Sequence, residues 1–485
     1  MRRALCAVAV LAVVLALGLA VPASAHHLRK AAAKTLPATT SSAKARELYE
    51  KGISDFENLY LERCNEDWRA AVKEDPKFGL AWAMIAWNSG NPQEVSDARA
   101  KARALAPTLT PGEQLMIAWI AKPQEGDYIG GISAMNDLME LYPSDKHVLY
   151  LAGNWLMLEN GDDQALVIMQ KALALDKNFA PGVNDLAYLY ARRREFDKAL
   201  RLMDRYVTML PKEPNPQDSY AELSRMAGKF DVALERYNAA LKIDPDFVSS
   251  QLGLADTYAL MGNQEQARVE YDKAIRFAHT EADRLTYDMQ KATTWVREGK
   301  YAEADKALQQ IASTAHAKEQ DLQEAQALQQ MAEYQADDQK ALKYAASAEE
   351  ALGHRSTISA VDRNEELSRI LRIRAVRAGD DKLSSEAMTR LQSLATSTRN
   401  RTILANWHGA AGAVLVRQKK FEAAIAELEE DQDNPVTMDL LAQAYYQANQ
   451  PEKLHELEAR LRGTNLPTLE QALVVPAARA RRPQI

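Results

Sequence analysis

Apolar residues recur every three or four positions through most of the chain, which is the pattern of helices with one buried face. The pattern is clearest in residues 195–211 (EFDKALRLMDRYVTMLP) and 229–245 (KFDVALERYNAALKIDP), which align at a shift of 34 residues. Helix-forming residues dominate, whereas Gly (20) and Pro (18) are scarce among 485 residues. The sequence therefore predicts an all-α fold built from an internal repeat.

A small residue stands at a fixed position in each repeat. These positions are 33 or 34 residues apart at first and 37 apart later: Cys64, Ala98, Gly131, Ala165, Ala199, Ala233, Ala267, Ala304, Ala341 and, after a gap, Ala424. A second small position lies 12 residues earlier, at Gly52, Ala86, Gly153, Ala187, Ala221, Ala255 and Gly412. Two antiparallel helices approach closely only where side chains are small, so each pair predicts a helical hairpin. Trp119 breaks the second series, and we expect the third hairpin to be distorted.

Turn signals separate the two helices of each predicted hairpin. Gly161, Gly228, Gly262 and Gly299 stand where a left-handed residue would end the first helix. The second helix should stop just before a proline, since proline cannot continue a helix interior. Such prolines are Pro76, Pro143, Pro211 and Pro245.

The unit resembles the tetratricopeptide repeat (TPR), a 34-residue helix–turn–helix. Leu186, Ala187 and Tyr190 match its first helix, and Asp244-Pro245 matches its end. The resemblance is strong over 44–280, weaker over 281–400 where the hairpins lengthen, and visible again over 401–462. It implies a right-handed superhelical solenoid of about ten TPR-like hairpins, in which each hairpin packs on its neighbours.

Both ends of the chain differ from the repeats. Residues 1–25 carry Arg2 and Arg3, an apolar run and an Ala-Ser-Ala site, which is the pattern of a cleaved signal peptide. An uncleaved membrane anchor is the alternative. We expect a flexible linker over 26–43. Over 463–485 we expect a Pro- and Arg-containing tail with a short helix near Thr468–Leu473, its basic tip being either solvated or a docking arm. The protein should then be periplasmic or secreted, with no stable membrane insertion after cleavage.

Net charge limits the classes of partner that the sequence favours, and the cysteine content limits the disulfides that it allows. Loss of Arg2 and Arg3 would take the formal net charge from −7 to −9, which disfavours nucleic-acid binding. Cys6 would leave with the signal peptide, so Cys64 could form no internal disulfide, and we expect it to act as a small buried apolar residue.

No residue pattern in the sequence predicts catalysis. Phosphate-binding glycine loops, a nucleophile elbow and zinc-type histidine pairs are missing from the sequence, so we expect no enzyme activity, no cofactor and no metal site. His26 and His27 would form a new amino terminus that could hold copper or nickel, or simply be an unstructured pair.

The resemblance places a partner-binding groove along the first helices of the hairpins. The residues that it assigns to this groove are His147, Tyr150, Asn154, Asn184, Tyr188, Asp218, Glu222, Arg225 and Asp256. Tyr150, Asp218 and Glu222 stand where cations would hold a carboxylate terminus, so a basic or neutral protein segment fits better. Ordinary solvated surface is the alternative for these residues. The sequence thus favours a non-enzymatic interaction scaffold or assembly factor. An enzyme or accessory subunit with an unrecognised site, or a small-ligand-binding solenoid, remains open.

Overall fold

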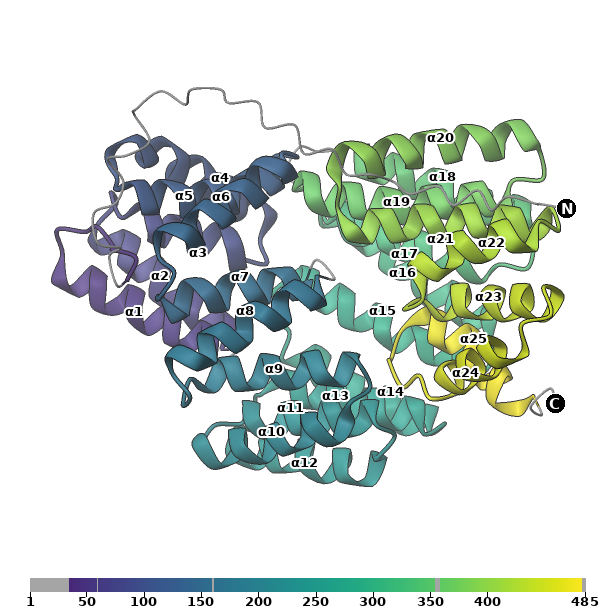
Figure 1. The fold of residues 1–485 in the computed structure, drawn as a ribbon, viewed down its shortest axis with the longest axis horizontal. Coiled ribbons are helices and arrows are strands. Elements are labelled where there is room, and N and C mark those ends of the chain that lie inside the picture. The colour runs from purple at the N-terminus through teal and green to yellow at the C-terminus, as the bar shows by residue number, and fades with distance from the viewer. Residues whose placement is uncertain (1–34, 59, 159–160, 354–357, 482–485) are drawn as a thin grey trace, which may run out of the picture.

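The protein is helical throughout the part that its computed structural model describes, which is residues 35–58, 60–158, 161–353 and 358–481 (Figure 1). No strand occurs in these residues. The all-α solenoid expected from the sequence is confirmed.

In the described residues, twelve antiparallel hairpins follow one another and a single helix comes last (Figure 1). The hairpins are α1 (Ala43–Glu57) with α2 (Leu61–Glu74), α3 (Gly79–Asn88) with α4 (Pro92–Leu105), α5 (Pro111–Gln124) with α6 (Tyr128–Leu141), α7 (Lys146–Leu158) with α8 (Asp162–Leu175), α9 (Ala180–Arg192) with α10 (Phe196–Met209), α11 (Asn215–Met226) with α12 (Phe230–Ile243), α13 (Val248–Leu260) with α14 (Gln264–Arg276), α15 (Glu281–Arg297) with α16 (Tyr301–Ala317), α17 (Asp321–Tyr334) with α18 (Asp338–Gly353), α19 (Ala360–Arg377) with α20 (Asp381–Thr398), α21 (Arg401–Arg417) with α22 (Phe421–Leu428), and α23 (Pro435–Gln447) with α24 (Pro451–Arg462), and the last helix is α25 (Leu469–Ala480).

Two of these hairpins account for the difference from the ten expected. In α19/α20 both helices have 18 residues, which displaces the small residue, Ala387, from the regular spacing. In α23/α24 the large Leu454 occupies the position that is small elsewhere. Several helices after residue 280 are longer than the earlier ones: α7, α9 and α13 have 13 residues each, whereas α15, α16 and α21 have 17. The helices from α22 onward are again short, with 8 to 13 residues.

The small positions lie where the helices touch. Ala165, Ala199 and Ala233 are 0% exposed. The small residue of the first helix faces a large side chain on the second helix, four residues after the small residue there. A Cβ added to Gly52 would lie 2.7 Å from Trp68 Cδ1, and a Cβ added to Gly153 would lie 2.7 Å from Met169 Cε. A glycine on the first helix therefore makes room for a large residue on the second.

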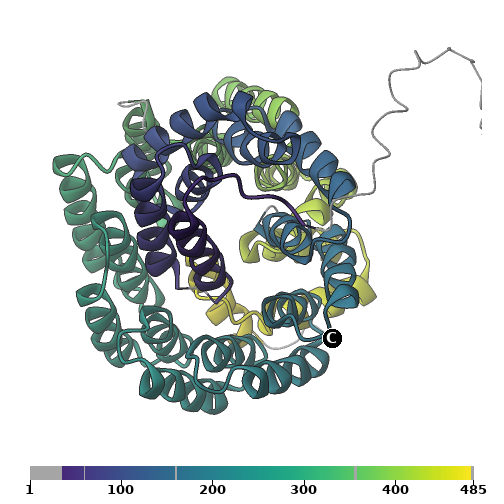
Figure 2. The ribbon, with the colours of Figure 1, turned by 90° about the vertical axis from the view of Figure 1, so that its left-hand side faces the viewer.

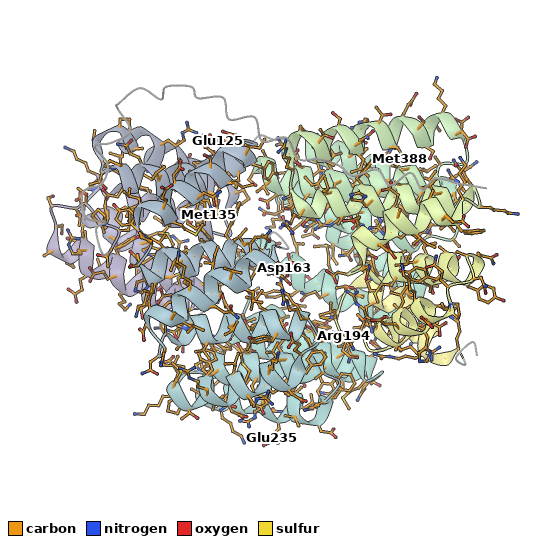
Figure 3. All side chains as sticks on the ribbon, in the orientation of Figure 1. Glu125, Met135, Asp163, Arg194, Glu235 and Met388 are labelled. Carbon is orange, nitrogen blue, oxygen red and sulfur yellow. The ribbon has the colours of Figure 1, made fainter. Side chains whose placement is uncertain are left out.

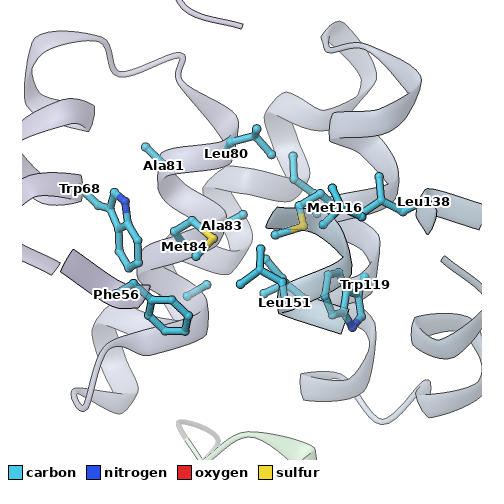
Figure 4. Close-up of a cluster of buried hydrophobic side chains, with 14 of the residues drawn as sticks. Phe56, Trp68, Leu80, Ala81, Ala83, Met84, Met116, Trp119, Leu138 and Leu151 are labelled. Atoms are coloured by element: carbon cyan, nitrogen blue, oxygen red, sulfur yellow. The ribbon is translucent and has the colours of Figure 1, made fainter. Parts of the chain in front are cut away.

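The third hairpin accommodates Trp119 by reversing this arrangement. The glycine here is Gly131 on the second helix, which packs against Pro123 of the first. The Trp119 ring, 1% exposed, lies edge-to-face with Trp87 and Trp155, at centroid distances of 5.0 and 6.1 Å. Figure 4 shows it in the N-terminal core with Met116 and Leu151.

The hairpin turns contain the left-handed residues that the glycines predicted, with one exception. Gly228, Gly262 and Gly299 have φ of 76°, 89° and 71°. Gly161 does not, because its φ is −89°. Arg194 adopts φ 61° at the equivalent turn position, where a side chain makes this conformation costly.

The hairpins wind around a common axis, and the chain contacts itself after one turn (Figure 2). The first hairpin lies inside the arc of the later ones, where the Tyr60 ring meets Phe247 at 6.2 Å and its hydroxyl donates to Glu213 at 2.6 Å. Helix α19 packs against α5. Asn465 donates to the carbonyl of Met226, which lies 239 residues earlier, at 3.2 Å.

Both flanking segments are more ordered than the sequence suggested. Of the expected linker 26–43, residues 35–42 run extended across the starts of the first hairpins, and residues 26–34, with His26 and His27, lie outside the described part. The backbone amides of this segment donate to carboxylates: Leu36 to Asp145 (2.6 Å), Thr39 to Glu113 (2.6 Å) and Ser41 to Asp75 (3.2 Å).

The expected tail contains the twelve-residue helix α25, twice the length predicted. Its basic residues are not all solvated: Arg479 donates to Asn465 at 2.6 Å and Arg481 to Asp439 at 2.7 Å. These bonds attach the described parts of both segments to the hairpins.

Candidate functional site

The predicted groove residues form a chain of hydrogen bonds that links successive first helices. The Asn154 amide of α7 donates to Asp185 of α9 at 3.1 Å. The Tyr188 hydroxyl of α9 donates to Glu222 of α11 at 2.7 Å. Arg225 of α11 continues the series into α13, as described next. The structure thus brings together polar side chains that the sequence scattered over about a hundred residues.

Arg225 is the central member of this chain. Its guanidinium donates to Glu222 at 3.1 Å and to Asp256 of α13 at 2.8 Å, and the residue is only 3% exposed. The Tyr271 hydroxyl also donates to Asp256. A buried ion pair with this many additional bonds fixes the relative position of two neighbouring hairpins.

Most of the predicted strip is packed between helices rather than presented to a partner. Five of its nine members are buried: Tyr150, Asn184, Asp218, Arg225 and Asp256. Tyr150 packs edge-on against Phe179 at 5.5 Å, because the first helices of adjacent hairpins lie too close for a tyrosine to remain free. The four half-buried members are His147, Asn154, Tyr188 and Glu222.

Burial changes the acidity of carboxyl groups in this strip. It raises the pKa of Asp218 to about 7, although the hydroxyl of Ser250 donates to this carboxyl at 2.6 Å and favours its charged form. Burial likewise raises the pKa of Asp185 to about 6. A hydrogen bond to Glu57 raises the pKa of the half-buried His147.

Sequence reasoning missed four partners in this network: Glu57, Asp185, Ser250 and Tyr271. Asp185 carried a usable signal, because an acid one or two residues from Val183 and Leu186 in a helix is expected to be buried and therefore paired. Glu57 carried no such signal, because it lies 90 residues from His147 in the sequence and only the tertiary fold brings the two side chains together.

Tyr188 and Glu222 border a cavity of about 540 Å³. Helices α9 and α11 form one side, and Arg460 with the non-helical residues 463–466 forms the other. Asp163 and Arg194, both labelled in Figure 3, lie at its edge. The cavity is of the size that holds a small ligand or a few residues of an extended peptide.

The charges around this cavity are mostly paired with each other. Arg192 bonds Asp162 at 2.8 Å, and Arg460 bonds Asp433 at 2.6 Å. Its polar groups therefore suit hydrogen bonding to a peptide backbone more than capture of a strong single charge.

Within the described ranges, no group of three or more His, Cys, Asp or Glu is arranged to hold a metal ion. No helix among the described residues is long and apolar enough to cross a bilayer. The Cys64 thiol is in no disulfide and is 0% exposed.

Comparisons with known proteins agree with the helical hairpins. Residues 225–262 match the family model described as TPR repeat. The described residues thus form an all-α solenoid of TPR-like hairpins, of which residues 225–262 match the repeat model itself.

Several solved structures are similar to the chain. They include a tetratricopeptide repeat protein from Parabacteroides merdae (15% identity, TM-score 0.36, covering 56% of this chain and 93% of that one) and yeast Tom70 (16%, 0.42, 84% and 96%). A third is the APC/C hetero-tetramer Cut9–Hcn1 (17%, 0.43, 82% and 76%). A comparison with curated protein sequences finds no match.

Proposed function

We propose that this protein is a non-enzymatic scaffold or assembly factor that acts outside the cytoplasm and binds an extended segment of another protein. The binding place is the cavity between α9, α11 and the C-terminal segment, where Tyr188 and Glu222 are half-buried. Periplasmic or secreted location is supported by the signal-peptide pattern of residues 1–25.

One observation carries the proposal: the solenoid already holds two non-helical segments of its own chain. Residues 35–42 lie along carboxylates at the helix starts, and residues 463–468 lie across the turns after α9 and α11. At residues 35–42 main-chain amides of the segment donate the bonds. At residues 463–468 the Gly463 and Thr468 carbonyls accept from Arg194 and Arg297, and the Asn465 side chain donates to the Met226 carbonyl. Main-chain bonds of this kind also hold extended peptides on other proteins. A partner segment needs the same complementarity, which Tyr188, Glu222 and Asn465 offer at the cavity.

Site-directed photocrosslinking tests this function. A photoreactive amino acid replaces Met226, which lines the cavity, and, as a matched control, Met261, which is 46% exposed at the next hairpin turn. In native extracts we expect one partner to be crosslinked from position 226 and not from 261. Equal crosslinking from both positions, or none from 226, would contradict the proposal.

Two conservative variants show whether the polar pair takes part. Tyr188→Phe and Glu222→Gln remove the hydroxyl or the charge while filling the same space, so we expect lower crosslinking at position 226 with little change in thermal stability. Unchanged crosslinking in both would argue against this pair. If the protein is exported as proposed, the protein purified from its native source should begin at His26. Measurement of its intact mass tests this.

A further inference from the structure

A second cavity, of about 360 Å³, lies beside the proposed peptide site among the last hairpins. Its wall comes from the first helices α17, α19, α21 and α23 and from Leu466, Thr468 and Glu470 of the C-terminal segment. Asp433 and Leu466 line both cavities, so the two are adjacent. No aromatic side chain is among the described residues that line the second cavity.

Both arginines that line this cavity in the described ranges already have a carboxylate partner. Arg372 donates to Asp431, which lines the same cavity, at 2.8 Å. Arg369 donates to Glu366 of its own helix at 3.1 Å. These two guanidinium groups are therefore neutralised within the protein.

Two carboxylates in the same wall have no such cation. Glu333 of α17 and Glu470 of α25 form no ion pair with the residues that the structure describes. Arg377 donates to the backbone carbonyl of Glu333 at 2.9 Å and to Asp338 at 3.1 Å, rather than to the Glu333 carboxylate. Burial raises the pKa of Glu333, and the Glu470 carboxylate raises it further, by more than Arg372 and Arg377 lower it.

A third group in this wall also lacks a donor. Gln329 lines the cavity one helical turn before Glu333 and is only 9% exposed. Its side-chain nitrogen donates to Glu333 in a long bond of 3.5 Å, and its side-chain oxygen accepts no hydrogen bond from the described residues. Polar side chains buried this deeply are usually paired. The cavity thus presents two carboxylates and an amide oxygen to whatever occupies it.

We propose that the second cavity receives the guanidinium or ammonium group of a basic side chain in the bound partner segment. This inference rests on the proposed function, because a segment in the peptide site would reach the second cavity past Asp433 and Leu466. A basic side chain supplies both the positive charge and the several N–H donors that these three acceptors require.

Other cations fit the second cavity less well. Among the described residues, no group of three or more metal-binding side chains is arranged to hold a metal ion. A quaternary ammonium group has no N–H to donate and is usually held by aromatic rings, which are missing from the described wall.

Calorimetric titration of the full chain at pH 8 and low salt tests the charge preference directly. The probes are the Nα-acetyl methylamides of arginine, citrulline and glutamate, which share a backbone and end in a guanidinium, a neutral urea and a carboxylate group. We expect the arginine probe to bind with one-to-one stoichiometry, at least about tenfold more tightly than the citrulline probe, and the glutamate probe not to bind. Equal binding of the arginine and citrulline probes, or no binding of the arginine probe, would overturn the proposal.

The double variant Glu333→Gln, Glu470→Gln should change binding and stability in different directions. It removes both charges and fills the same space, so affinity for the arginine probe should fall about tenfold. The melting temperature should stay the same or rise, because a buried carboxylate without a cation is costly. The matched control is Glu235→Gln, Glu422→Gln, which changes the net charge equally at two exposed positions outside the cavity. An equal loss of affinity in both double variants would show that net charge alone attracts the probe, and would overturn the proposal.

Photocrosslinking from position 226 separates this inference from the proposed function. We expect the Glu333→Gln, Glu470→Gln variant to crosslink less partner than the control double variant. Undiminished crosslinking would overturn the inference and leave the peptide site standing. Absence of crosslinking from position 226 with both glutamates present would overturn the peptide site, whereas the titration would still decide whether the cavity holds a basic group.

Discussion

Replacing Gly253 by alanine tests whether close approach of the helices sets the packing of the array. Gly253 lies in the middle of α13, against the ring of Tyr237 from α12. An added Cβ would come within 3.0 Å of three Tyr237 side-chain atoms, among them the hydroxyl oxygen at 2.7 Å. Tyr237 is 2% exposed and cannot move aside into solvent.

Two opposing effects set the size of the change. Overpacking a buried site costs about 1–3 kcal/mol. Alanine in a helix interior is favoured over glycine by about 0.5–1 kcal/mol. The packing cost is the larger effect, so we expect Gly253→Ala to lower the free energy of unfolding by about 1–2 kcal/mol.

Gly353→Ala is the matched control, because nothing lies within 4 Å of the Cβ that it would add. We expect it to be neutral or stabilising by up to about 1 kcal/mol. Urea unfolding followed by far-ultraviolet circular dichroism measures both variants, and hydrogen exchange locates the loss in α12 and α13. Similar stability changes in the two variants would refute the packing argument.

Two more predictions concern the buried polar network. Arg225→Met should lower the free energy of unfolding by about 3 kcal/mol, since it leaves the Asp256 carboxyl buried without its cation; a urea midpoint equal to that of the wild type would contradict this. The raised pKa of Asp218, about 7 against 3.8 for an ordinary Asp, means that the folded protein keeps a proton which the unfolded chain releases, so stability falls as pH rises from about 4 to about 7. Asp218→Asn should therefore reduce this pH dependence and raise the melting temperature at pH 8. Melting temperatures measured across this pH range that fall as steeply in the variant as in the wild type would count against it.

The regular part of the fold could be predicted because its signals are local. Ala199 and Ala233 report helix contacts within one hairpin, and Gly228 and Gly262 report turns within a few residues. The small-residue rule failed at Leu454, where a large residue occupies the small position. The glycine-turn rule failed at Gly161, whose backbone is not left-handed.

The candidate sites could be predicted only in part. The repeat resemblance correctly pointed to Tyr188 and Glu222, which lie together at the cavity. It could not show that these two side chains reach the cavity whereas Tyr150 is buried. The opposite wall of that cavity comes from residues 463–466, and no local pattern indicates that Asn465 returns to Met226.

The return of the C-terminal segment changes how the protein should unfold. In an open repeat array each unit depends on its neighbours alone, so the terminal units fray first. Here Arg297 of α15 donates to Gln471 in α25, and Asn465 bonds the turn after α11, so the last residues are attached to the middle of the chain. These bonds should protect the C-terminal hairpins from fraying. We therefore expect the solenoid to unfold as one cooperative unit.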